Sequence, residues 1–214
     1  MTLPTSGLIT VNDRGARAAT TFGSVAAAGG NMVFIKKLTA SSSGTLSFVN
    51  GASSVVLDST YKEYLFTFNN MHPGTDNINF TFNLSADSGS NYNVTKTTSF
   101  FEAYHNEGDS DLDLAYAGGR DLAQSTAFQQ LNGAGVQDED DGSISGTLHL
   151  FNPSSTTFVK HFMSSSISNA HNGSYAWNAY MSGYGNTTSA VDAVQFKMSS
   201  GNIDAGDICL YGIL

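Results

Sequence analysis

The stretch 146–163 constrains the fold most, because it predicts two β-strands joined by a short connection. Leu148 and Leu150 alternate with more polar residues, which is the period of a strand. Pro153 ends this strand, since proline fixes φ and lacks an amide donor. Residues 157–163 then resume with β-branched and aromatic side chains, which favour strands. A two-stranded unit is marginal alone, so the remaining chain must supply more sheet.

Similar strand-length segments recur along the chain between turn-forming residues. They lie at 32–38, 45–49, 54–57, 61–68, 78–84, 98–104, 175–181, 191–198 and 207–213. The pair Asn50–Gly51 predicts a hairpin between 45–49 and 54–57. Regular alternation predicts a half-exposed antiparallel strand at 78–84. Residues 69–77 are predicted to form a turn region, and residues 119–131 are predicted to contain a short helix. About ten such strands predict an all-β sandwich or barrel.

Residues 1–30 differ in composition from the rest of the chain. Positions 12–30 hold six Ala and four Gly, which leaves little apolar surface for a core. We therefore expect an N-terminal attachment arm over 1–30 and a β-sandwich domain over 31–214. A loose tail is the alternative for the arm, because chain termini are often poorly ordered. The candidate attachment residues are the larger apolar side chains of the arm: Leu3, Leu8, Ile9, Val11 and Phe22.

The overall charge restricts the classes of partner. The net charge of −9 argues against nucleic acid, whose phosphates require a basic surface. No apolar run approaches the roughly 18 residues of a membrane helix, so no membrane insertion is expected. The start of the chain also lacks the basic and apolar regions of a signal peptide, which predicts no export by that route.

Two acidic runs are the only candidates for a metal site. The first, Asp109-x-Asp-x-Asp113, begins like a calcium-binding loop but has Leu114 and Arg120 where that loop needs Gly and Glu. The second, 138–141, has no ligand spacing. Neither the histidines nor the serines form a zinc or nucleophile motif. We therefore expect no structural metal and no cofactor, with a weak calcium site in one of the acidic loops as the alternative. No motif selects a catalytic group, and an enzyme that cleaves surface polysaccharide stays open as an alternative function.

Four aromatic residues form the best candidate for ligand binding: Tyr175, Trp177, Tyr180 and Tyr184. Aromatic faces stack on sugar rings, and neighbouring Asn or Asp side chains can bind hydroxyl groups. The alternative is that Tyr175 and Trp177 share one face of a strand and pack into the core, as aromatic residues commonly do.

Both ends of the chain resemble virion proteins of tailed bacteriophages, especially marine phages. Residues 3–13, from Leu-Pro-Thr-Ser-Gly to Asn-Asp, resemble the opening of tail and tail-fibre proteins. Residues 196–213 resemble a C-terminal strand–turn–strand of virion proteins, and 146–153 resemble part of the same pattern. The chain departs from the opening pattern at Arg14, where an apolar residue usually begins a helix.

The resemblance implies a non-enzymatic structural protein on the exterior of the virion, assembled in the host cytoplasm. The location would be a tail fibre, a tail-associated protein or a head decoration. The implied fold is an antiparallel, jelly-roll-like β-sandwich. The implied partners are other virion proteins and further copies of the chain, with a trimer as the expected homo-oligomer. A lectin-like module that binds a host surface glycan or receptor is the alternative function.

Overall fold

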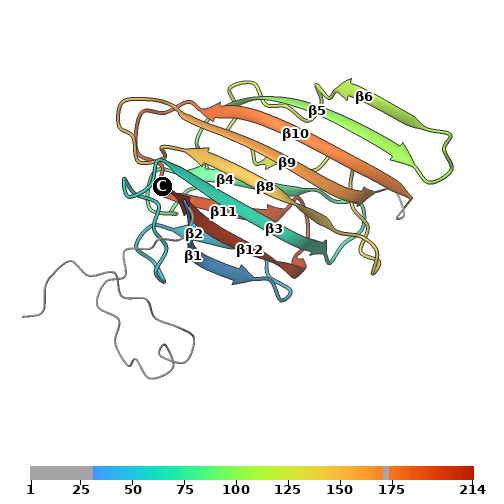
Figure 1. Ribbon diagram of the computed structural model, residues 1–214, viewed down its shortest axis with the longest axis horizontal. Coiled ribbons are helices and arrows are strands. Elements are labelled where there is room, and N and C mark those ends of the chain that lie inside the picture. The colour runs from blue at the N-terminus through green and yellow to red at the C-terminus, as the bar shows by residue number, and fades with distance from the viewer. Residues whose placement is uncertain (1–30, 171–173) are drawn as a thin grey trace, which may run out of the picture. The chain divides into compact units, whose positions relative to one another are not determined.

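The part of the chain that the structure describes consists of two antiparallel β-sheets (Figure 1). The computed structural model describes residues 31–170 and 174–214. Its strands are β1 (Met32–Thr39), β2 (Leu46–Val49), β3 (Glu63–Pro73), β4 (Phe80–Ser85), β5 (Lys96–Asn106), β6 (Leu112–Tyr116), β7 (Gln129–Gln130), β8 (Ile144–Phe151), β9 (Lys160–Ala170), β10 (Tyr175–Gly185), β11 (Ala193–Met198) and β12 (Ile203–Ile213). The arm residues Leu3, Leu8, Ile9, Val11 and Phe22 lie outside the described residues.

The strand partners follow a regular scheme. The large sheet has the order β1-β12-β3-β8-β9-β10-β5-β6, and the small sheet has the order β2-β11-β4-β7. Thus β1 pairs with β12, β2 with β11, β3 with β8 and β4 with β7, in alternate sheets. The remaining strands β9, β10, β5 and β6 extend the large sheet toward the top of the view in Figure 1.

Phenylalanine side chains from both sheets make the centre of the core. Phe48 of β2 meets Phe66 of β3 with ring centroids 5.3 Å apart, and Phe82 of β4 meets Phe162 of β9 at 5.2 Å. Phe196 of β11 packs against Phe66 as well. All five are buried, and burying each such side chain contributes about 1.5–3 kcal/mol. These contacts hold the two sheets face to face, so the predicted β-sandwich is confirmed.

The predicted strand pair at 146–163 is confirmed as β8 and β9. Leu148 lies opposite Ser164, and Leu150 lies opposite Phe162 in the antiparallel register. Residues 31–170 and 174–214 contain twelve strands, where about ten were predicted. The two short strands β6 and β7 lie outside the segments that were predicted as strands.

Three predictions of local secondary structure were wrong. Residues 54–57 form no strand, because the Leu57 amide donates to Asn50 Oδ1 in a tight local loop while β2 pairs with distant β11. Residues 69–73 are not a turn, since β3 continues through Pro73 across an irregularity in its register with β8. The stretch 119–131 contains no helix.

Strand β4 was predicted to be half-exposed and is instead buried along its whole length. The polar side chains of β4 have partners in loops and on the neighbouring strand β11. Asn83 Nδ2 donates to the carbonyl oxygens of Tyr92 and Thr126, at 2.6 and 3.0 Å. Thr81 Oγ1 donates to the Lys197 carbonyl. The alternation of 78–84 was therefore correct for strand formation but misleading for exposure.

The extension of the large sheet has one open face. Along β9, the side chains of Lys160, Phe162 and every second residue after them are buried, while His161, Met163 and Ile167 are exposed. Phe158 and Phe162 alternate with Val159 and Met163 in the sequence, which predicts that both faces of 157–163 are at least partly covered. This prediction is wrong, because nothing among the described residues packs over the second face. This open face is called the outer face below.

Candidate ligand-binding groove on the outer face

Strand β10 divides the predicted aromatic cluster between its two faces. Successive side chains of a strand point to opposite faces. Trp177 is 6% exposed and Tyr175 is half-buried, both on the inner side of the strand. Tyr180 and Tyr184 lie on the outer face, where Tyr180 is 39% exposed. The four residues therefore do not form one site.

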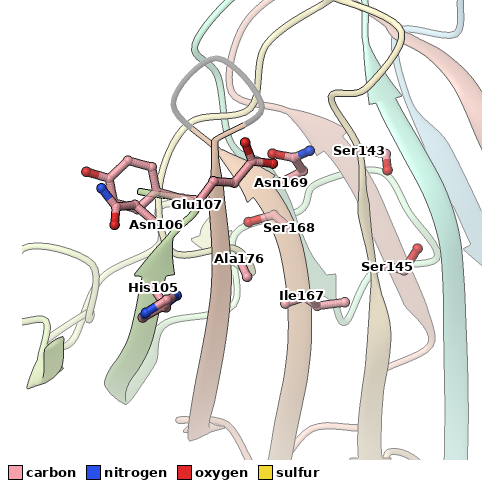
Figure 2. A pocket seen from close by; sticks show the side chains of 10 residues that line it. His105, Asn106, Glu107, Ser143, Ser145, Ile167, Ser168, Asn169 and Ala176 are labelled. Carbon is pink, nitrogen blue, oxygen red and sulfur yellow. The ribbon is translucent and has the colours of Figure 1, made fainter. Parts of the chain in front are cut away.

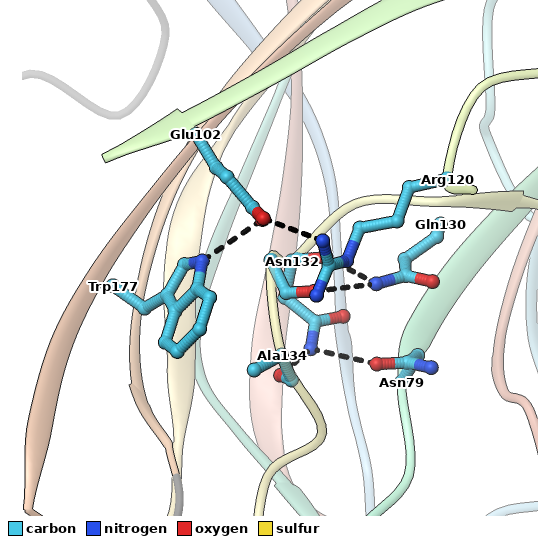
Figure 3. A network of polar contacts seen from close by, with 8 residues as sticks. Asn79, Glu102, Arg120, Gln130, Asn132, Ala134 and Trp177 are labelled. Carbon is cyan, nitrogen blue, oxygen red and sulfur yellow. Dashed lines mark hydrogen bonds and ion pairs between the residues drawn. The ribbon is translucent and has the colours of Figure 1, made fainter. Parts of the chain in front are cut away.

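Trp177 belongs to a buried polar network (Figure 3). Its Nε1 donates to Glu102 Oε2 at 2.9 Å, and Arg120 Nη1 forms an ion pair with Glu102 Oε1 at 2.5 Å. The Arg120 guanidinium also lies 5.9 Å from the centre of the indole ring. A side chain at Gly133 would overlap this ring, so the loop must have glycine there. Trp177 thus has a structural role.

Tyr175 is held in a similar way at the end of the same strand. Its hydroxyl donates to Asp111 Oδ2 at 2.8 Å, and this hydrogen bond raises the pKa of Tyr175. Its ring packs beside Tyr104, with centroids 6.0 Å apart. The acidic run 109–113 therefore supplies partners to nearby side chains, since Asp109 Oδ1 also contacts His105 Nε2 at 3.0 Å.

An exposed aromatic pair marks the outer face. The rings of Phe101 on β5 and Tyr180 on β10 stack, with centroids 5.0 Å apart and planes inclined by 12°. Phe101 is 46% exposed although it is a large apolar residue. In the sheet register, Tyr116 lies beside Phe101 and Ser165 lies beside Tyr180. Sequence reasoning missed Phe101, whose exposure follows only from the lack of a covering layer.

Three adjoining hollows form one groove along β9, which follows the outer face and at its end also reaches Ser168 and Tyr175 of the inner side. The hollow at the aromatic pair has a volume of about 260 Å³ and shares Thr147 and Ser165 with the next, of about 310 Å³. That hollow shares Ser145 and Ile167 with a third, of about 420 Å³. Figure 2 shows this third hollow, lined by His105, Asn106, Glu107, Ser143, Ser145, Ile167, Ser168, Asn169, Tyr175 and Ala176.

The groove lining carries little charge. Among the described lining residues there is no Lys or Arg, and the only carboxylate is that of Glu107. His149, at the end near the aromatic pair, lies with its Nδ1 2.6 Å from Glu63 Oε1. The remaining polar groups are hydroxyls and amides, so the groove is suited to an uncharged polar ligand.

Two buried lysines, which sequence reasoning also missed, flank Gly185 on the inner side of the large sheet. Lys96 and Lys160 each lie opposite Gly185 in register and are fully buried. Burial lowers the pKa of Lys96 from 10.5 to about 7 and lowers that of Lys160 as well. Lys160 Nζ donates to the Phe158 carbonyl at 2.6 Å. The alternation of 157–163 gave one indication that Lys160 is buried, since it placed Lys160 on the same face as Phe162.

One acidic cluster brings carboxylates together. Asp76, Asp138 and Glu139 are exposed, and one oxygen of each lies within 4.8 Å of the others. The second acidic run thus meets Asp76 from the β3–β4 connection, a contact that spacing alone did not predict. Exposed acidic groups commonly lie close together without a metal.

Comparisons with protein-family models, curated proteins and solved structures find no match to this chain. None of the described residues belongs to a helix that is long and apolar enough to span a membrane.

Proposed function

We propose that this chain is a non-enzymatic structural component of a tailed-phage virion, displayed on the particle exterior. It would belong to a tail fibre or tail-associated protein, with head decoration as the other location. The resemblance of residues 3–13 and 196–213 to virion proteins supports this assignment. The protein would assemble with other virion proteins in the host cytoplasm and remain in the virion.

The observation that carries the proposal is the strand pairing. Pairs β1–β12, β2–β11, β3–β8 and β4–β7 alternate between the two sheets, which is the arrangement of a ribbon rolled into two Greek keys. On this interpretation the sandwich is a jelly roll, an architecture used by viral capsid and lectin domains. Because a fold alone does not define a function, this supports the assignment only together with the resemblance.

A homo-oligomer, with a trimer as the expected form, is part of the proposal. Edge strand β6 exposes Leu112, Leu114 and Tyr116 on one face, with exposed fractions of 62–70%. Exposed apolar edge strands readily pair with another chain. Light scattering should therefore show a species larger than the monomer, and a monomer at high concentration would contradict this part.

Reconstruction of purified phage particles tests the location. Antibodies against residues 31–214 should label the tail or the head surface, and density for a β-sandwich should be visible there. Absence of the protein from purified particles would refute the proposal.

A second candidate function is recognition of a host surface glycan or receptor. The stacked Phe101–Tyr180 pair favours it, because this pair is exposed within a groove lined by polar groups. The two functions can coexist in one virion protein. A glycan array probed with the full chain tests the second candidate independently of the first.

A further inference from the structure

The groove along β9 has the length and shape for a chain-like ligand. Its floor runs from Met163 to Asn169, which is six residue steps on one strand. At about 3.3 Å per residue the groove is about 20 Å long, enough for several sugar rings in a row. Shared lining residues make the three hollows continuous, so a ligand can extend from one to the next.

Small side chains keep the groove open. The outer face presents Ser165 on β9, Thr147 on β8, and Ala176 and Ser182 on β10. Large residues stand at intervals: Met163 and Tyr180 near one end and Ile167 further along. Alternating apolar faces and hydroxyl groups match a sugar chain, whose rings present apolar faces and polar edges.

Asn169, at the far end, leaves part of its amide without a partner. Its Oδ1 has no hydrogen-bond partner among the described residues, although the residue lines the third hollow. A buried polar atom without a partner has lost its hydration without gaining a hydrogen bond, which is unfavourable. A ligand hydroxyl that donates to this oxygen, after a small rotation of the amide, would remove that cost.

The charge of the groove selects against anionic glycans. No Lys or Arg lines it among the described residues, while Glu107 stands at one end and Glu63 lies next to His149 at the other. A carboxylate or sulfate on the ligand would meet no cation there and would be repelled by the net charge of −9.

We infer that this groove binds an uncharged oligosaccharide of several sugar rings, with one ring stacked on the Phe101–Tyr180 pair and the chain following β9 toward Asn169. The inference rests on the second proposed function, and it names the ligand class and the position of the ligand. It does not require Trp177, which is covered on the inner side of the sheet.

An array of neutral and acidic oligosaccharides, probed with the full chain, tests the ligand class. Neutral oligosaccharides should bind and acidic ones should not, and affinity should rise with ligand length until the groove is filled. Preferential binding of acidic ligands would overturn the ligand class while leaving glycan recognition intact. Absence of binding to every glycan would refute both the inference and the second proposed function.

Variants then test the position. Phe101→Ala should weaken binding about tenfold through loss of stacking, and Ser165→Tyr should block the groove and weaken binding at least as much. The matched controls are Phe158→Ala and Ser59→Tyr, which alter exposed residues outside the groove lining and should bind like the native chain. Circular dichroism should show that all four variants fold. If the folded groove variants bind as tightly as the controls, glycan recognition stands but the groove is the wrong site.

Discussion

At the scale of single residues, Lys96 couples stability to pH. Its ammonium group is fully buried and donates to Asn83 Oδ1 and to the Val94 carbonyl, neither of which is charged. Burial therefore lowers the pKa of Lys96 from 10.5 to about 7. Between these two pH values the unfolded chain binds more protons at this residue than the folded chain does.

The free energy of unfolding should consequently increase as pH rises from 7 toward 10.5. The slope from Lys96 is at most about 1.4 kcal/mol per pH unit. Lys96→Met should remove this part of the slope, because methionine does not titrate. Urea denaturation of the native chain and of the variant across this pH range measures the two slopes. An unchanged slope in the variant would show that Lys96 does not cause the pH dependence of stability.

The ion pair of Glu102 provides a second prediction. Arg120→Ala leaves the Glu102 carboxylate nearly buried, and the Trp177 indole is then its remaining side-chain donor among residues 31–170 and 174–214. We expect the free energy of unfolding to fall by about 3 kcal/mol, the lower range for breaking a buried pair, since Arg120 is partly exposed. Trp177 fluorescence during urea denaturation measures the change.

The exposed pair of Lys37 and Asp207, 2.7 Å apart, is the control. Lys37→Ala should lower the free energy of unfolding much less than Arg120→Ala does, because solvent screens surface ion pairs. Equal losses in the two variants would contradict the structural importance of the Glu102 network.

The candidate site was only partly predictable from its residues. Tyr175 and Trp177 differ in parity from Tyr180 and Tyr184, so a single strand had to place them on opposite faces. Each of these two pairs is aromatic, so the alternation along the strand could not show which of the two faces is covered by other residues. The inner face is covered near Trp177 because a loop brings Arg120 and Gly133 against the indole ring. This is a tertiary contact, which the pattern of one strand does not contain.

At the scale of elements, the close approach of β8 and β9 depends on Gly146. A Cβ atom at this position would overlap the Ser165 carbonyl oxygen of the neighbouring strand and crowd the Phe68 ring. Gly146→Ala should therefore lower the free energy of unfolding by about 1–3 kcal/mol, the usual cost of overpacking. Thermal denaturation followed by circular dichroism measures the loss.

Gly119→Ala is the matched control for this substitution. No atom lies within 4 Å of a Cβ atom placed at Gly119, so the change should be neutral or slightly stabilising. If Gly146→Ala proves equally harmless, the two strands can separate at little cost and the register of β8 with β9 is less constrained than proposed.

Element boundaries were predictable where the strand period was clear, and exposure was not. The segment 78–84 shows this, because Asn83 looked exposed by alternation but is buried under the loops that contain Tyr92 and Thr126. The Asn50–Gly51 turn shows that strand pairing was also not predictable from a local pattern. A favourable turn pair predicted a hairpin, but β2 pairs with distant β11 instead.

At the scale of the whole molecule, composition and strand spacing predicted the β-sandwich, but strand order did not follow from them. The pairing of β1 with β12 joins segments at opposite ends of the described chain. Such partners are selected by packing of the complete core, in which Phe48, Phe82 and Phe196 from three separate segments meet. A local pattern contains no information about that selection.

The last prediction concerns a shortened chain that begins at Asn31. Residues 31–214 form one compact unit containing both sheets and the aromatic core, so the shortened chain should fold and show the far-UV circular dichroism of a β-sheet protein. If residues 1–30 are the attachment arm, it should not enter phage particles that lack the native copy. Normal incorporation would refute the role of the arm. Failure to fold would instead show that the sandwich needs residues 1–30, with 8–11 as the segment to test next for strand pairing.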